Sequence, residues 1–62
     1  SVSVLHHSVA LADAWATALT VLGAERGLEL AEAYNLAAYF IVRTESGYQQ
    51  LSSRQFEQLR LD

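Results

Sequence analysis

Two oxygen-bearing side chains, Asp13 and Thr17, stand four residues apart within an otherwise apolar stretch, residues 11–19. Asp13 is the only charged residue among the first 24 when both histidines are neutral. Residues at this spacing on a helix share one face, with their Cβ atoms about 6 Å apart, so both side chains can reach one ligand. A carboxylate and a hydroxyl are hard oxygen ligands, which suit Mg²⁺ or Ca²⁺ better than zinc or copper.

Two interpretations of Asp13 remain open at this point. An ionised carboxylate among apolar side chains is costly unless something pairs with it, and a metal ion would be such a partner. Alternatively, Asp13 is an ordinary surface or hydrogen-bonded residue, because Asp and Thr at this spacing occur on many helices. Two oxygens would in any case leave most of the coordination sphere to water, main-chain carbonyls or a substrate phosphate.

The other residues whose side chains could bind a ligand or take part in a reaction give weaker indications of function. His6 and His7 adjoin at a strand end, where neighbouring side chains point to opposite faces, so we expect a structural or exposed role for both. Trp15 is expected in the core. The chain has no cysteine, and its three glycines are isolated, which excludes thiolate sites and a Gly-rich phosphate loop. No catalytic residue is therefore assigned, and these residues alone would not make an enzyme.

Length and charge limit the possible function classes. The 62 residues form at most one domain, which can bury only about 60% of its unfolded surface. The net charge of −3 and the absence of a basic cluster argue against nucleic-acid binding. The longest uncharged run, residues 1–12, is too short to span a bilayer. Because 52% of the residues are hydrophobic, we expect a piece of a larger protein, and a self-sufficient small domain is the alternative.

Hydrophobic periodicity predicts three elements in the first half of the chain. Alternation over residues 1–7 predicts a half-buried strand. Ser8 is a typical N-cap for a helix over residues 9–22, which ends at Gly23. A second helix is predicted over residues 24–34.

The first of these helices has a bulky face and a small-residue face, at about 100° per residue. The bulky face is expected to form the core, and it consists of Leu11, Ala14, Trp15, Ala18 and Leu22, with Leu19 at its edge. The small-residue face consists of Asp13, Ala16, Thr17 and Thr20. Because a helix that is apolar almost all round is usually covered on both sides, this second face is expected to meet a sheet, another domain or a ligand. We therefore expect it to be less buried in this chain than in the parent protein.

The second half of the chain is predicted to return to the sheet. Residues 36–42 form a nearly unbroken apolar run that favours a buried strand, and a turn leads to a second strand over residues 48–51. Ser52 and Gln55 fit a capping box at the start of a last helix. Three residues of this helix are expected to face inward: Phe56, Leu59 and Leu61. The predicted fold class is α+β, with the order β-α-α-β-β-α and helices packed on a small sheet.

Several segments together carry a family resemblance. The most specific is the A-D-A-x-A-T-A-L run at residues 12–19, closed by V-L-G at residues 21–23. The resemblance extends through the strand at residues 1–4, the segment 25–32 and the later strand and helix. This pattern is similar to the C-terminal part of the ApbE family. Its members are FAD:protein FMN transferases, long labelled thiamine biosynthesis lipoproteins.

The resemblance implies a site and a reaction. Members of the family split FAD and attach FMN through a phosphoester to a Thr or Ser of a target flavoprotein, using Mg²⁺. By that likeness Asp13 and Thr17 would be metal ligands. FAD, the target flavoprotein and the remainder of the ApbE-like domain would be the partners. The parent would be a periplasmic or membrane-anchored bacterial lipoprotein.

The resemblance also implies that residues 1–62 are the C-terminal segment of an ApbE-like domain. The family's H-I-I/L-D-P-x-T-G segment does not occur in these residues, so we expect the chain to be inactive by itself. His6 and His7 stand where relatives often carry a small or apolar residue and a proline, so the likeness assigns them no role. The alternative function is a flavin-binding or protein-interaction module without transferase activity.

Overall fold

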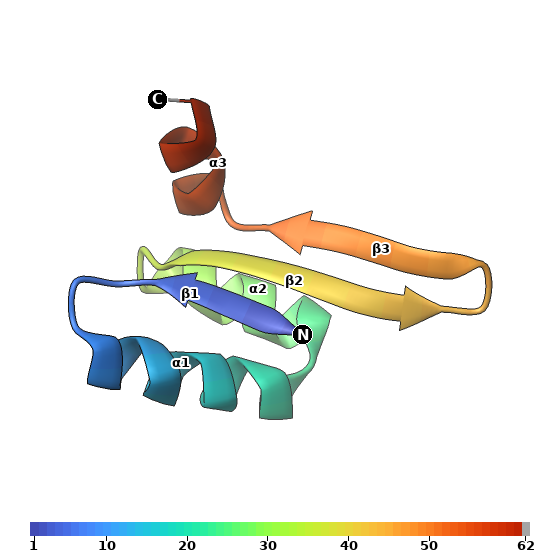
Figure 1. Cartoon of the computed structure of the whole chain (residues 1–62), viewed down its shortest axis with the longest axis horizontal. Coiled ribbons are helices and arrows are strands. Elements are labelled where there is room, and N and C mark those ends of the chain that lie inside the picture. The colour runs from blue at the N-terminus through green and yellow to red at the C-terminus, as the bar shows by residue number, and fades with distance from the viewer. Residues whose placement is uncertain (62) are drawn as a thin grey trace.

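The structure is a computed structural model that describes residues 1–61. Its elements in chain order are β1 (Val2–Leu5), α1 (Val9–Leu22), α2 (Ala24–Ala33), β2 (Ala37–Thr44), β3 (Gly47–Ser52) and α3 (Arg54–Leu61) (Figure 1). This order and the α+β class confirm the prediction from the sequence. None of the helices described in residues 1–61 is long and apolar enough to cross a membrane.

The three strands form one antiparallel sheet in the order β1-β2-β3, with β2 in the centre. Phe40 of β2 is 1% exposed and packs with Leu19 of α1 and Ala31 of α2, so it points to the face that these two helices cover. Neighbouring strand residues point to opposite faces. Tyr39 therefore points to the other face, where its ring stacks on Phe56 of α3 with centroids 5.2 Å apart. The sheet thus has two helices on one face and the start of a third on the other.

Local signals set the ends of the helices. The Ser8 hydroxyl accepts a hydrogen bond from Leu11 N–H at 3.3 Å, as expected for the N-cap of α1. Gly23 has a φ of 86°, and its N–H donates to the Leu19 carbonyl at 3.2 Å, so it separates α1 from α2. Asn35 adopts a φ of 56°, which turns the chain from α2 into β2. The sequence predicted all three boundaries within one residue.

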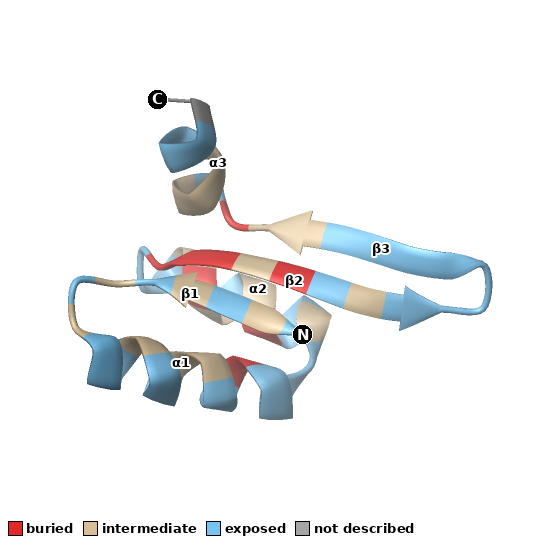
Figure 2. Ribbon diagram, viewed as in Figure 1, coloured by how far each residue is buried: buried red, intermediate tan, exposed pale blue. Residues whose placement is uncertain are grey.

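The core lies between the central strand and the first two helices. Figure 2 shows that buried positions are concentrated in the first half of β2, whereas the far end of the β2–β3 hairpin is exposed. The buried hydrophobic residues of the core pack as one cluster: Leu19, Ala31, Leu36, Ala38 and Phe40. A Cβ at Gly27 would lie 3.0 Å from Phe40 Cε2, so the missing side chain permits the close approach of α2 to the sheet.

The buried face of α1 differs from the predicted bulky face. The side turned toward the sheet carries the fully buried Leu19 and three half-buried residues: Ala12, Trp15 and Ala16. Leu11 is 50% exposed and Leu22 is 39% exposed, and Ala14 and Ala18 are exposed as well, so the prediction that these residues form the core is wrong for this chain. Alanines facing the sheet allow a close approach of helix and strand, which the bulk of the leucines would prevent. Trp15 packs at the margin of the core, against the ring of Tyr34 at 5.2 Å.

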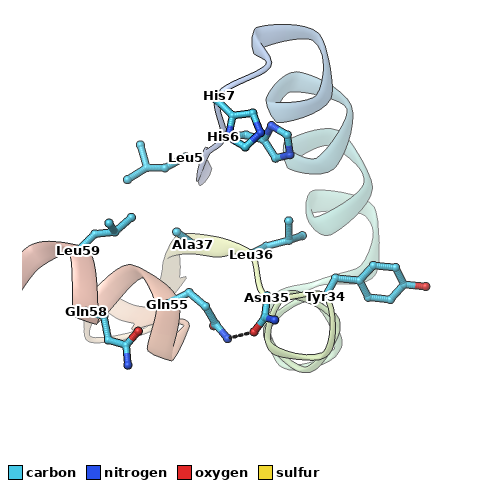
Figure 3. Close-up of a pocket in the computed structure, with 10 residues that line it drawn as sticks. All are labelled: Leu5, His6, His7, Tyr34, Asn35, Leu36, Ala37, Gln55, Gln58 and Leu59. Atoms are coloured by element: carbon cyan, nitrogen blue, oxygen red, sulfur yellow. Dashed lines mark hydrogen bonds between the residues drawn. The ribbon is translucent and has the colours of Figure 1, made fainter.

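Two predictions for the last helix also need correction. The N-cap is the fully buried Ser53, which accepts a hydrogen bond from Phe56 N–H at 3.3 Å, and not Ser52. Ser52 is instead the last residue of β3, and its hydroxyl bonds Glu57. Phe56 packs on Tyr39 as expected of an inward residue. Leu59 faces the open cavity between α3 and the end of β1 and is 54% exposed there, so it is not a core residue (Figure 3). The expectation for Leu61 falls on a side chain outside the described part of the chain.

Candidate metal-ligating flank of helix α1

Asp13, Thr17 and Thr20 form one exposed strip along α1, which we call the polar flank. The helix carries Asp13 and Thr17 one turn apart, as the sequence predicted, and both are exposed. Asp13 is the only charged residue on α1. The flank therefore presents a single negative charge with hydroxyl groups beside it.

The carboxylate of Asp13 is solvated and not buried. The ion pairs within residues 1–61 join Arg54 with Glu32 and Arg60 with Glu57, and neither these nor any hydrogen bond there engages the Asp13 carboxylate. The expectation that this charge stands among apolar side chains is therefore wrong for this chain, because the apolar residues of α1 point to other sides. Asp13 is exposed, so its carboxylate oxygens are accessible to a cation.

The threonine hydroxyls are oriented by the helix itself. Thr17 Oγ1 donates to the main-chain carbonyl of Asp13 at 3.0 Å, and Thr20 Oγ1 donates to that of Ala16 at 2.7 Å. Since each hydroxyl uses its one proton inside the helix, the lone pairs of its oxygen remain available to an outside group. A carboxylate and a hydroxyl oxygen on one flank are donors of the kind that hard cations prefer.

The flank is only part of a coordination sphere. Within residues 1–61 there is no group of three or more His, Cys, Asp or Glu side chains that could hold a metal ion. Mg²⁺ demands near-octahedral oxygen coordination and surrenders its water reluctantly. Any site built on Asp13 and Thr17 therefore needs further ligands from a substrate, from water or from another segment.

The two histidines lie elsewhere, at a cavity of about 470 Å³ between the end of β1, the start of β2 and α3 (Figure 3). Their ring centroids are 4.7 Å apart, so the expectation that they point to opposite faces is wrong. The reason is that β1 ends at Leu5, before the pair, and strand alternation ends with it. Neither Asp13 nor Thr17 lines this cavity.

The hydrogen bonding of His6 makes it a poor metal ligand. Its Nδ1 accepts from the Ser8 N–H at 3.0 Å, which assigns the proton of the neutral ring to Nε2. Neither nitrogen then has a lone pair free for a metal. His6 instead holds the turn that leads into α1, which is the structural role expected of it.

Sequence reasoning missed the amide pair on the opposite wall of this cavity. Gln55 Nε2 donates to Asn35 Oδ1 at 2.9 Å and joins the start of α3 to the α2–β2 turn (Figure 3). The two residues are 20 positions apart, so no local pattern indicates that they meet. Asn35 was predicted only as a helix stop, and Gln55 only as a capping residue.

Comparison with known proteins identifies the family. The ApbE family model matches residues 1–40, which include β1, α1 and α2 with the polar flank. The FAD:protein FMN transferase of Haemophilus influenzae is 44% identical over 59 residues, which are 95% of this chain and 17% of that protein. The enzyme of the same name from Vibrio cholerae is 42% identical over 57 residues, or 92% of this chain and 17% of that protein.

Solved structures show the same arrangement of elements. The apo crystal structure of Pseudomonas stutzeri flavinyl transferase ApbE gives a TM-score of 0.90 at 45% identity, over 94% of this chain and 19% of that one. The flavin transferase ApbE from Vibrio cholerae gives 0.89 at 40% identity, over 92% of this chain and 18% of that one. This chain thus spans 17% of the length of the curated relatives it matches. It belongs to the ApbE family.

Proposed function

We propose that residues 1–62 are the C-terminal segment of an Mg²⁺-dependent FAD:protein FMN transferase, and that Asp13 and Thr17 supply two of the metal ligands. The observation that carries this proposal is the exposed Asp13 carboxylate, without a partner in residues 1–61, one turn from Thr17 within the family-matched segment. Relatives named FAD:protein FMN transferase support the reaction class. The acceptor would be a Thr or Ser of a target flavoprotein.

The roles of the two side chains follow from their chemistry. Asp13 would attract the cation with its full charge, and the oxygen of Thr17 would ligate it while its proton stays on the Asp13 carbonyl. When bound, the ion would neutralise the pyrophosphate of FAD and stabilise the oxyanions that develop as the phosphoryl bond breaks. The same oxygens would accept Ca²⁺, whose looser geometry makes fewer demands on the remaining ligands.

By itself this chain would neither hydrolyse nor transfer flavin, because it supplies two ligands and no assigned catalytic residue. By family likeness, the parent would work in the bacterial periplasm or as a membrane-anchored lipoprotein. The other candidate, a flavin-binding or protein-interaction module, predicts flavin or partner binding without FMN transfer.

A chimera tests the proposal. This chain replaces the aligned 59 residues of the Haemophilus influenzae enzyme, and FMN transfer to a flavoprotein is followed against Mg²⁺ concentration. Asp13→Ala should abolish Mg²⁺-dependent transfer by the chimera and leave the melting temperature of the 62-residue chain nearly unchanged, because Asp13 is exposed in that chain. Glu29→Ala, an exposed acid on α2, is the matched control and should transfer normally. Unchanged transfer with Asp13→Ala would remove the ligand assignment.

A further inference from the structure

The outer edge of β1 is open. The strand has β2 on one side, and no other strand of residues 1–61 pairs with it. Ser1 and Ile41 exchange both of their main-chain hydrogen bonds, at 2.7 and 2.8 Å. In an antiparallel pair, residues that exchange two main-chain hydrogen bonds alternate with residues that exchange none. Every second residue of β1 therefore directs its N–H and C=O groups at β2. The intervening residues, Val2 and Val4, direct their N–H and C=O groups to the open edge.

This edge has only one of the features that usually protect an exposed strand, its short length of four residues. Natural edges are often short, and they commonly also carry charged side chains, proline, a bulge or a covering segment. The sequence of β1 is V-S-V-L, and its register with β2 is uninterrupted. The side chains of Val2 and Val4 are half-buried and pack against the core, which holds the strand in place. An ordered, uncharged edge of this kind is suited to pairing with another strand.

The open edge and the polar flank lie on the same side of the molecule. α1 contacts β1, whereas α2 contacts β2 and β3 (Figure 1). Trp15 turns toward α2, where it meets the Tyr34 ring. Asp13 is two residues away on a helix with about 100° per residue, so it faces the opposite side, away from α2. A strand added beside β1 would therefore run next to the polar flank.

We propose that the open edge of β1 pairs with a strand from the part of an ApbE-family domain that lies outside these 62 residues. The chain spans 17% of the Haemophilus influenzae relative and 19% of the Pseudomonas stutzeri structure, so more than four fifths of each lies outside the matched segment. The choice of partner rests on the proposed function, whereas the geometry of the edge does not.

Val4→Pro tests the pairing, because proline removes the outward N–H of Val4 and leaves the hydrogen bonds to β2 in place. Val4→Ala is the matched control, since it shortens the side chain but keeps the N–H. Both variants are made in the 62-residue chain and in the chimera. In the isolated chain the two variants should have similar melting temperatures. In the chimera the proline variant should melt about 5 °C below the alanine variant. An equal difference in both contexts would overturn the proposal.

Two further measurements do not depend on folding of the chimera. The amides aligned with Val2 and Val4 in full-length Vibrio cholerae ApbE should have protection factors against hydrogen exchange about 100-fold higher than those of Val2 and Val4 in the isolated chain. Equally fast exchange would contradict the pairing. Light scattering that finds a dimer of the 62-residue chain, lost in Val4→Pro, would assign the edge to a second copy and overturn the proposal. A chimera with a protected β1 edge but no FMN transfer would refute the proposed function and not the pairing.

Discussion

Thr17 Oγ1 donates its hydrogen bond to the main-chain carbonyl of Asp13, at 3.0 Å. This bond fixes the hydroxyl against the helix, so that its oxygen lies one turn from the Asp13 carboxylate on the exposed flank of α1. The bond is local, between residues four apart, and needs no tertiary contact. The flank is therefore preorganised even in this short chain, before any other part of a metal site is present.

Thr17→Val should separate the ligand role of the hydroxyl from its effect on the helix. Valine keeps the shape and the β-branch but has no oxygen, and Thr17 is exposed in the 62-residue chain, so the melting temperature of that chain should change little. We expect the Mg²⁺ concentration for half-maximal FMN transfer to rise at least about tenfold, which corresponds to a charge–dipole contact of about 1.4 kcal/mol.

Thr17→Ser is the control for that substitution, because it keeps the oxygen and loses only a methyl group. It should transfer FMN with nearly the original dependence on Mg²⁺. If Thr17→Val and Thr17→Ser behave alike, the hydroxyl is not a ligand.

The 62-residue chain should bind Mg²⁺ only weakly. Asp13 and Thr17 offer two oxygens, and Mg²⁺ keeps its hydration shell unless more ligands replace it. Isothermal titration calorimetry on the chain should detect no strong binding, and incubation with FAD and Mg²⁺ should release no FMN. Submicromolar affinity for Mg²⁺ would contradict the inference that this chain supplies only part of the coordination sphere.

The element order followed from local signals, which is why the sequence predicted it. Ser8 caps α1, Gly23 takes a left-handed φ between the helices, and Asn35 does so before β2. Each acts within a few residues of its own position. The family resemblance, carried by the run around Asp13 and Thr17, also rested on contiguous residues, and the family match over residues 1–40 confirms it.

The errors arose where tertiary contacts decide. α1 is apolar on more than one side, so periodicity alone could not select the side that Leu19 buries against the sheet. Ser52 and Ser53 are both suitable caps for α3, and burial against β2 selected the second. His6 and Ser8 meet in a turn whose geometry depends on where β1 ends. In each of these cases the sequence of a single helix or strand does not determine which residue is buried, capped or bonded.

Ser53→Ala should destabilise the chain strongly. The Ser53 hydroxyl donates to the Leu36 carbonyl at 2.7 Å and accepts from Ala38 N–H at 3.0 Å, besides capping α3. Its removal takes this partner from the buried carbonyl of Leu36 and the buried N–H of Ala38, at a cost of about 2–3 kcal/mol. Urea denaturation followed by circular dichroism measures this loss. Ser52→Ala, one residue earlier and half-buried, should cost less than about 1 kcal/mol. Equal losses for the two variants would contradict the assignment of Ser53 as the cap.

The pH dependence of stability should include a contribution from Glu57. The hydrogen bond from the Ser52 hydroxyl, at 2.5 Å, holds the pKa of the Glu57 carboxyl below its ordinary value of 4.5, and Arg60 at 2.9 Å adds to the effect. A lowered folded-state pKa means that the unfolded chain takes up the proton more readily. The stabilisation is therefore present above pH 4.5 and is lost as the pH falls through the folded-state pKa.

Carboxyl NMR titration of Glu57 checks this sign directly. The contribution is small, because the Glu57 side chain is 39% exposed and solvent screens its charge. In Ser52→Ala the pKa of Glu57 should move up toward 4.5, because the largest cause of the lowering is gone, while Arg60 retains a minor effect. In Arg60→Gln the upward movement should be smaller than in Ser52→Ala. The reverse order would show that the ion pair, and not the hydroxyl, holds the carboxylate in its charged form.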